Sequence, residues 1–252
     1  MPFIEANGIR FNMHTIGHGP PVVMVHGAFV GSLASWYLTV ASSLAQKYRI
    51  LLYDLRGHGK SDKPTDGYDV ATMAADLHAV TIASECVAPF SLVGHSYGAL
   101  IAIRYTLDHP ERVTRLSIID APLPPGEMRS IKEFLNRTPK ELVASLPAPA
   151  RVMIRLGGRR VTKFMESVRF LAFKTSLTKD IMDASEISDE ELGKIGCPVL
   201  CIYGKDSPCL PAGERLHAAI PSSRLEIVKG GHFVHLDATK LVVRKLEEFF
   251  HG

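Results

Sequence analysis

The feature that most constrains the fold of this chain is a regular alternation of short apolar runs with longer helical patterns. Runs of this kind are typical of parallel strands buried on both faces, and the alternation predicts a mostly parallel sheet with helices on both sides. The expected strands are residues 21–25, 49–53, 90–93, 113–119, 198–203 and 224–228, and the expected helices are residues 35–47, 70–87, 97–108, 212–220 and 238–250.

Two further strands precede this pattern. Residues 3–6 and 9–16 flank the turn Asn7-Gly8, which predicts a hairpin and brings the sheet to eight strands. The chain has 252 residues, of which 46% are hydrophobic and 22% charged. This length and composition are typical of one globular domain of the α/β class.

One long stretch interrupts the alternation. Residues 122–195 contain no convincing strand but several prolines and apolar helical patches. Because loops of this length are rarely unstructured inside compact domains, we expect a small helical lid inserted after the sixth strand. The core would then comprise residues 1–121 and 196–252.

The lid segment carries a run of basic residues. Since charged side chains are usually exposed, we favour a solvated helix face for this run. The alternative is a surface that binds a carboxylate or phosphate of the substrate. The residues concerned are Arg151, Arg155, Arg159, Arg160 and Lys163.

Charge and cysteine usage exclude several classes of protein. The formal net charge is only +3, without a long Lys/Arg block, so we expect no nucleic-acid partner. The N-terminus lacks a secretory signal and no run reaches about 18 apolar residues, which favours a cytoplasmic protein without a membrane span.

Cys197 and Cys201 lie in one predicted strand, about 13 Å apart. This distance is too long for a disulfide, so we expect free thiols. Nothing in the sequence indicates the oligomeric state.

The segment Gly94-His95-Ser96-Tyr97-Gly98 lies directly between a predicted strand and a predicted helix. A serine on so tight a turn presents its hydroxyl above the sheet, and glycines are needed where a side chain would collide with neighbouring backbone. The five-residue pattern is common by itself, but its strand and helix flanks make it specific. Ser96 is therefore a candidate nucleophile.

A serine hydroxyl needs a general base, and that base needs a third group to orient it. His232 follows the last predicted strand, and Asp206 follows the strand before it. Both positions lie at the carboxyl ends of strands, where open α/β sheets bind ligands. Asp120 also follows a core strand and is the alternative acid.

Two more segments carry a family resemblance, His26-Gly27-Ala28-Phe29 and residues 54–61. With the serine turn, they make the chain similar to the alpha/beta-hydrolase superfamily, in the lipase, esterase and epoxide-hydrolase-like branch with a helical lid. The resemblance implies an eight-stranded hydrolase fold and a Ser-Asp-His catalytic triad. The implied roles are nucleophile for Ser96, acid for Asp206, base for His232, and oxyanion-hole N–H donors for Tyr97 and for Ala28 or, less favoured, Phe29.

The other residues near these segments receive narrower interpretations. We expect Phe29 and Tyr97 to touch substrate and His26 to hold the oxyanion loop. His95 and His235 are interpreted as structural, with His95 pointing away from the site. Residues 54–61, rich in glycine and charge, are interpreted as a fixed supporting turn.

These residues predict a carboxylesterase-type serine hydrolase that cleaves a small or medium acyl substrate through an acyl-enzyme. The histidines and cysteines lack metal-ligand spacing, and no metal or cofactor is expected. A thioesterase or acyltransferase, a hydrolase of carbon–carbon bonds, and a hydrolase-like ligand receptor remain open as alternatives. Dehalogenases and epoxide hydrolases of this superfamily use aspartate at the position of Ser96, which argues against both.

Overall fold

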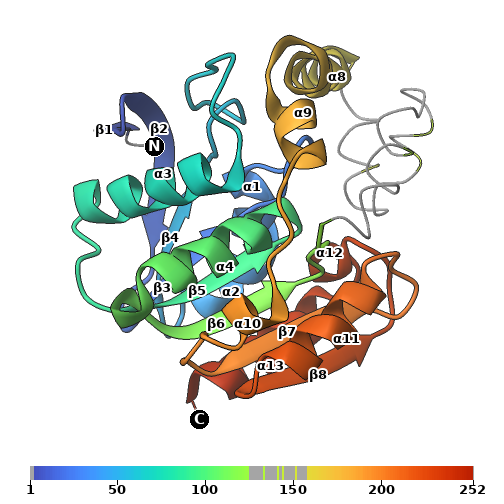
Figure 1. The fold of residues 1–252 in the computed structure, drawn as a ribbon. Helices are drawn as coiled ribbons and strands as arrows, with labels where there is room; N and C mark the ends of the chain where they lie inside the picture. The colour runs from blue at the N-terminus through green and yellow to red at the C-terminus, as the bar shows by residue number, and fades with distance from the viewer. Residues whose placement is uncertain are drawn as a thin grey trace.

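The computed structural model describes residues 3–124, 133, 141, 144, 151 and 158–251. Its centre is one eight-stranded sheet in the order β1-β2-β4-β3-β5-β6-β7-β8 (Figure 1). The strands are β1 (Phe3–Ala6), β2 (Ile9–Ile16), β3 (Pro21–Val25), β4 (Arg49–Tyr53), β5 (Phe90–His95), β6 (Val113–Ile119), β7 (Val199–Gly204) and β8 (Ser223–Val228). All eight predicted strands are confirmed.

The pairing is mostly parallel, as predicted. β1 with β2 and β2 with β4 are antiparallel, and the pairs from β4 through β3, β5, β6 and β7 to β8 are parallel. In the register, His95 is opposite Ile119, which in turn is opposite Ile202. The residues that leave these strands therefore emerge side by side at one edge of the sheet.

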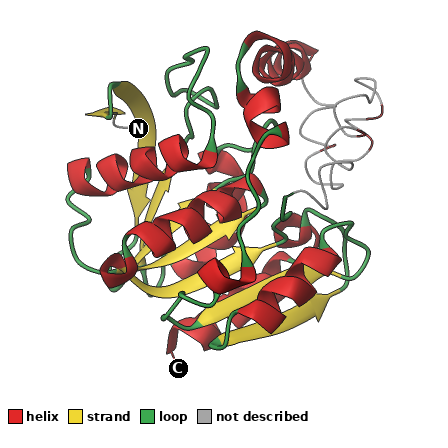
Figure 2. Cartoon of the chain, in the orientation of Figure 1, coloured by secondary structure: helices red, strands yellow, loops and turns green. Residues whose placement is uncertain are grey.

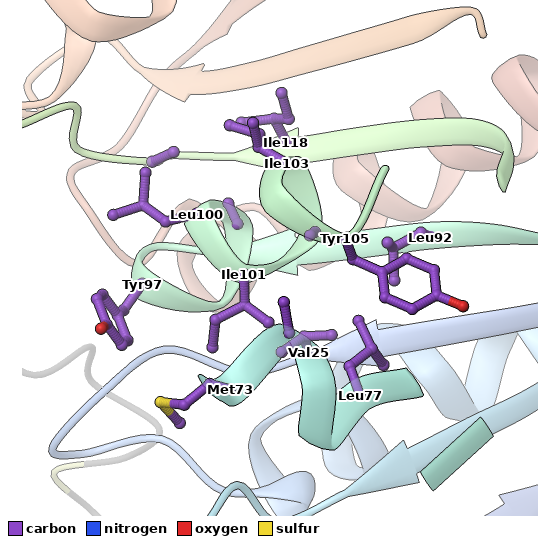
Figure 3. Packing of buried hydrophobic residues seen from close by; sticks show 14 of the residues in the cluster. Val25, Met73, Leu77, Leu92, Tyr97, Leu100, Ile101, Ile103, Tyr105 and Ile118 are labelled. Atoms are coloured by element: carbon purple, nitrogen blue, oxygen red, sulfur yellow. The ribbon is translucent and has the colours of Figure 1, made fainter. Parts of the chain in front are cut away.

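Helices cover both faces of the sheet (Figure 2). One cluster of buried side chains unites Val23 and Val25 of β3 with α3 (Val70–Ala83), α4 (Tyr97–Asp108) and α11 (Leu210–Ala219), and Figure 3 shows part of it. Val22 and Met24 alternate with Val23 and Val25 along β3 and belong to a second cluster of buried side chains. That second cluster includes side chains of α1 (Leu33–Trp36), α2 (Ser42–Leu44) and α13 (Thr239–His251). Short elements complete the core, namely η2 (Pro110–Arg112) and α12 (Val234–Asp237).

The single helix predicted over residues 35–47 is divided in the structure. α1 and α2 are separated by η1 (Tyr37–Ala41), a stretch of π-helix. The hydroxyls of Thr39 and Ser42 donate hydrogen bonds to the carbonyls of Ser35 and Tyr37. Side-chain hydrogen bonds of this kind compete with the regular helical pattern, and the hydrophobic pattern alone does not report them.

Between β6 and β7, the described residues form helices α8 (Gly158–Lys174), α9 (Leu177–Met182) and α10 (Asp189–Leu192). α9 is joined to the core, because the Asp180 carboxylate accepts from the Tyr68 N–H at 3.1 Å and Ser176 N–H donates to the Thr65 carbonyl at 2.7 Å. A lid over residues 122–195 stays a prediction, since most of residues 125–157 lie outside the described part.

The basic run is also described only in part. Lys163 is exposed, and the Arg151 guanidinium donates to the Ala144 carbonyl at 3.3 Å. Arg155 and the side chains of Arg159 and Arg160 lie outside the described residues. In the part of the chain that the structure describes, no helix is both long and apolar enough to cross a membrane.

Candidate active site

Ser96 occupies the turn between β5 and α4 with φ +53° and ψ −126°, a strained conformation for a residue with a side chain. Its N–H donates to the Ile119 carbonyl at 3.0 Å. The flanking glycines are required by close backbone contacts. A Cβ on Gly94 would lie 2.5 Å from Ala99 Cα, and one on Gly98 would lie 2.4 Å from the His26 carbonyl oxygen.

His232 connects this serine to a buried carboxylate. Its Nε2 lies 2.9 Å from Ser96 Oγ, and its Nδ1 lies 2.9 Å from Asp120 Oδ1. The Asp120 side chain is fully buried, whereas 27% of the His232 side chain is exposed. Because a carboxylate oxygen only accepts, Nδ1 carries the proton and Nε2 is free to accept the Ser96 proton. The three side chains have the arrangement of a nucleophile, its base and the group that orients the base.

Asp206, the acid predicted from the sequence, does not contact His232. It is exposed, and its backbone N–H donates to the Gly230 carbonyl at 3.0 Å. The prediction that Asp206 orients His232 is therefore wrong, and Asp120, the alternative, occupies that position. The loop around Asp206 supports Asp120 instead: Gly204 N–H donates to Asp120 Oδ2 at 2.8 Å, and the Ser207 hydroxyl donates to Oδ1.

The sheet register explains this outcome. Ser96 directly follows His95, the last residue of β5, and Asp120 directly follows Ile119, the last residue of β6. His95 and Ile119 are paired in the sheet. Asp120 thus emerges on the strand next to the nucleophile, whereas Asp206 lies two residues beyond Gly204, the last residue of β7, on a turn that faces solvent. The sequence placed both candidate acids after core strands, and the pairing of β5 with β6 distinguishes them.

Backbone strain marks the same place. Among the described residues, five non-glycine residues have positive φ, and three of them are Phe29 at +59°, Ser96 at +53° and Asp120 at +48°. Such conformations cost of order 1–3 kcal/mol each and persist only where surrounding contacts hold them. Two of these three strained residues, Ser96 and Asp120, are the ones that His232 connects, and Phe29 lies in the loop after β3.

The loop after β3 lies against the nucleophile. A Cβ on Gly27 would be 3.0 Å from Ser96 Cβ. His26 fixes this loop as expected, because its Nε2 accepts from Leu55 N–H at 3.0 Å and its Nδ1 lies 2.8 Å from the Gly27 carbonyl. Burial lowers the His26 pKa to about 4, so this imidazole is neutral near pH 7. Ala28 follows directly, where an oxyanion-hole donor is predicted.

Tyr97 and Phe29 are both buried, with 3% and 7% of their surface exposed. Tyr97 is the first residue of α4, so its N–H has no acceptor within the helix. Its hydroxyl donates to the Tyr68 carbonyl at 2.6 Å. The polar end of Tyr97 is therefore engaged within the protein, and substrate contact by either side chain stays a prediction.

His95 plays a larger part than its sequence context indicates. Its Nε2 lies 2.9 Å from the His232 carbonyl oxygen, so the ring supports the segment that carries the base rather than pointing away from it. The His235 ring packs against it, with centroids 4.1 Å apart. Burial lowers the pKa of His95 well below 6.5 and that of His235 to about 3. Both rings are neutral near pH 7.

Two more neighbours of the site were missed by sequence reasoning. Cys209 Sγ lies 3.7 Å from His232 Nδ1, and the Ser207 hydroxyl bonds to Asp120. Both residues belong to the segment after β7 in which Asp206 was chosen. Their spacing in the sequence does not reveal these contacts, because Asp120 and His232 follow other strands of the sheet.

Residues 54–61 have the supporting role that was predicted. The buried Asp54 carboxylate accepts from Asn12 Nδ2 at 2.7 Å, Leu33 N–H at 2.8 Å and Lys60 N–H at 2.9 Å. Arg56 forms a buried ion pair with Asp76 at 2.6 Å. These contacts fix the turn next to the loop of His26.

Comparison with known proteins agrees with this geometry. Residues 22–245 match the model of the alpha/beta hydrolase family. The chain belongs to this family. The matched residues include the turn of Ser96 and the segment of His232, so the family assignment covers the whole candidate site.

Relatives of this alpha/beta hydrolase are moderately similar in sequence. A putative carbamate hydrolase of Klebsiella pneumoniae is 31% identical over 228 residues, which cover 85% of each chain. A putative non-heme chloroperoxidase of Synechocystis is 29% identical over 92% of each chain. Among solved structures, an esterase from Exiguobacterium antarcticum has a TM-score of 0.78 and 26% identity over 99% of both chains. A meta-cleavage product hydrolase from Pseudomonas fluorescens, at 23% identity and a TM-score of 0.81 over 100% of this chain and 97% of that one, shares the fold.

Proposed function

We propose that this alpha/beta hydrolase cleaves carboxylic esters of small or medium acyl substrates, with Ser96 as nucleophile, His232 as base and Asp120 as the acid. The observation that carries the proposal is the continuous chain of two 2.9 Å contacts through the His232 ring. A buried carboxylate on Nδ1 fixes the tautomer that leaves Nε2 able to take the serine proton.

In the first half of the reaction, the Ser96 hydroxyl passes its proton to His232 Nε2 while Oγ bonds to the acyl carbon. Asp120 stabilises the imidazolium that forms. His232 then gives this proton to the departing alkoxide, which leaves as an alcohol and produces the acyl-enzyme. In the second half, His232 deprotonates a water, which attacks the acyl carbon and releases the carboxylic acid with Ser96 restored.

The charge that develops on the acyl oxygen needs preorganised donors. We assign this role to the backbone N–H groups of Ala28 and Tyr97, which follow Gly27 and Ser96 in the chain. Support comes from the close approach of Gly27 to Ser96 and from the position of Tyr97 as first residue of α4, where the helix dipole favours negative charge. Removing one such donor typically costs about 10²- to 10³-fold in kcat.

Ester hydrolysis is favoured among the reactions available to such a triad. The similarity to the solved esterase, at 26% identity over nearly all of both chains, supports it. Carbamate hydrolysis is the second candidate, because the relative at 31% identity is named a putative carbamate hydrolase. Both reactions begin with attack by the serine on an acyl carbon, so the same machinery serves them.

The test is hydrolysis of p-nitrophenyl esters from acetate to long acyl chains by wild type, Ser96→Ala and Ser43→Ala. Ser43 is exposed on α2 and provides a matched control. We expect multiple turnovers with a preferred chain length, a loss of at least about 10³-fold in kcat for Ser96→Ala, and little change for Ser43→Ala.

A parallel assay with a p-nitrophenyl carbamate ranks the second candidate by kcat/KM. Full activity in Ser96→Ala would refute the serine mechanism. A single slow turnover by the wild type on every substrate would instead favour a ligand receptor built on the hydrolase fold.

A further inference from the structure

A third chemically active group lies beside the pair His232 and Asp120. Cys209 Sγ is 3.7 Å from His232 Nδ1, the nitrogen that also lies 2.9 Å from Asp120 Oδ1. One donor atom from each of these three residues can be chosen so that all lie within 4.8 Å of one another. Thiolate, imidazole and carboxylate are the ligands that Zn²⁺ uses in proteins.

We propose that Cys209, His232 and Asp120 form a binding site for a thiophilic divalent cation such as Zn²⁺ or Cd²⁺, and that its occupation inhibits the enzyme. The soft sulfur ligand selects this class of cation, since Mg²⁺ and Ca²⁺ prefer sets of oxygen ligands. The inferred inhibition rests on the proposed function, whereas the binding itself does not.

Two of the three separations between ligand atoms are close to those of tetrahedral coordination. With zinc bonds of about 2.3 Å to sulfur and about 2.0–2.1 Å to nitrogen, two ligand atoms at a tetrahedral angle lie about 3.6 Å apart. The observed separation of Cys209 Sγ and His232 Nδ1 is 3.7 Å. Nitrogen and carboxylate oxygen would lie about 3.3 Å apart around zinc, against 2.9 Å here, so this pair must separate by a few tenths of an ångström. The Cys209 sulfur and the Asp120 oxygen, which lie within 4.8 Å of each other, must come to about 3.6 Å.

The ligands come from three fixed points of the fold. Asp120 follows β6 and is held by Gly204 N–H. Cys209 directly precedes α11, and its N–H donates to Ser207 Oγ at 3.1 Å. His232 is the most accessible of the three, which gives an ion a route to the site. A thiolate and a carboxylate together neutralise a divalent cation, and such compensation is what a charge needs in a buried site.

Binding at Nδ1 would block catalysis through the tautomer of His232. The ion takes the nitrogen that normally carries the proton, the thiol releases its proton to solvent, and the ring proton resides on Nε2. Nε2 then donates toward Ser96 and is unable to accept the serine proton. Inhibition should therefore lower kcat.

Binding is measured first, by equilibrium dialysis with CdCl₂ and ZnCl₂ and by the ultraviolet charge-transfer band of a cadmium–thiolate bond. We expect one tightly bound ion per chain in the wild type, and an affinity at least about 10-fold lower in Cys209→Ala. Cys197→Ser is the matched control, since Cys197 is a free thiol outside this group, and it should bind as the wild type does. Should Cys209→Ala fail to fold by circular dichroism, Cys209→Ser serves in its place.

Inhibition is measured second, with each variant compared with its own metal-free activity. Zn²⁺ and Cd²⁺ should inhibit the wild type and Cys197→Ser equally, Cys209→Ala should need at least about 10-fold more metal, and MgCl₂ should have no effect. Equal cadmium affinity in wild type and Cys209→Ala would overturn the site. Binding without inhibition of an active enzyme would overturn the regulatory inference, and binding by a protein inactive on every ester would separate the site from the proposed function.

Discussion

Asp120 and His232 are 112 residues apart in the chain, yet Asp120 Oδ1 lies 2.9 Å from His232 Nδ1. The carboxylate is fully buried and also accepts from Gly204 N–H and the Ser207 hydroxyl. A carboxylate that is desolvated and held by this many donors is rigidly placed. It therefore orients the His232 ring, whose Nε2 lies 2.9 Å from Ser96 Oγ.

Replacement of this carboxylate by an amide tests the corrected triad. Asp120→Asn should lower kcat by about 10³- to 10⁴-fold, because the amide no longer holds the proton on Nδ1. Asp206→Asn is the matched control and should stay within about 2-fold of wild type, as expected for an exposed residue. The measurement is steady-state hydrolysis of the preferred p-nitrophenyl ester. A large loss in Asp206→Asn with an active Asp120→Asn would restore the original assignment.

His95 is expected to act as a positioning residue for the segment that carries the base. His95→Phe removes the contact with the His232 carbonyl and should lower kcat about 5- to 10-fold, the effect of one hydrogen bond of about 1–1.5 kcal/mol. We expect KM to stay unchanged, because only 4% of the His95 surface is exposed. His95→Gln keeps an N–H donor and should recover part of the loss. An equal loss of kcat in both variants would count against a role for the hydrogen bond.

The buried histidines should make stability depend on pH. Burial lowers the pKa to about 4 for His26, to about 3 for His58 and His235, and well below 6.5 for His95. As pH falls below 6.5, the unfolded chain takes up protons before the folded protein does. The free energy of unfolding should therefore be largest near neutral pH and fall between about pH 6.5 and pH 4, by up to about 1.4 kcal/mol per pH unit for each histidine.

Chemical denaturation at several pH values in this window measures that slope. His235→Phe should reduce it by up to about 1.4 kcal/mol per pH unit, whatever its effect on stability at pH 7. His251→Asn, which replaces an exposed histidine, should keep the wild-type slope. A slope unchanged in His235→Phe would show that this ring does not titrate with unfolding.

Gly98 should be intolerant of any side chain. A Cβ there would lie 2.4 Å from the His26 carbonyl oxygen and 2.6 Å from that of Val25, and backbone has little freedom to move aside. Gly98→Ala should cost about 1–3 kcal/mol or more, which lowers Tm by at least about 2–4 °C in a chain of this size. Gly196→Ala, where nothing lies within 4 Å, should leave Tm nearly unchanged. Thermal unfolding of both variants distinguishes a packing requirement from a general preference for glycine.

The sequence by itself determined the features that depend on neighbouring residues. Alternating apolar runs predicted six strands, the turn Asn7-Gly8 predicted the hairpin of the first two, and the glycines around Ser96 predicted the turn that presents its hydroxyl. His232 was also found, because a serine nucleophile needs a general base and His232 follows the last predicted strand, in the order typical of the superfamily that the chain resembles. These signals are local, since hydrophobic periodicity and the steric limits of a tight turn depend on a few neighbouring residues.

Which carboxylate contacts His232 was decided only by the tertiary structure. Asp120 and Asp206 both follow core strands, and their local sequences do not rank them. The pairing of β5 with β6 sets Asp120 beside Ser96, while Asp206 turns to solvent and its loop donates hydrogen bonds to Asp120. The same long-range placement brings Cys209 Sγ to 3.7 Å from His232 Nδ1 and His95 Nε2 to 2.9 Å from the His232 carbonyl oxygen. Contacts of this kind depend on strand order and register, which arise when the whole sheet is assembled.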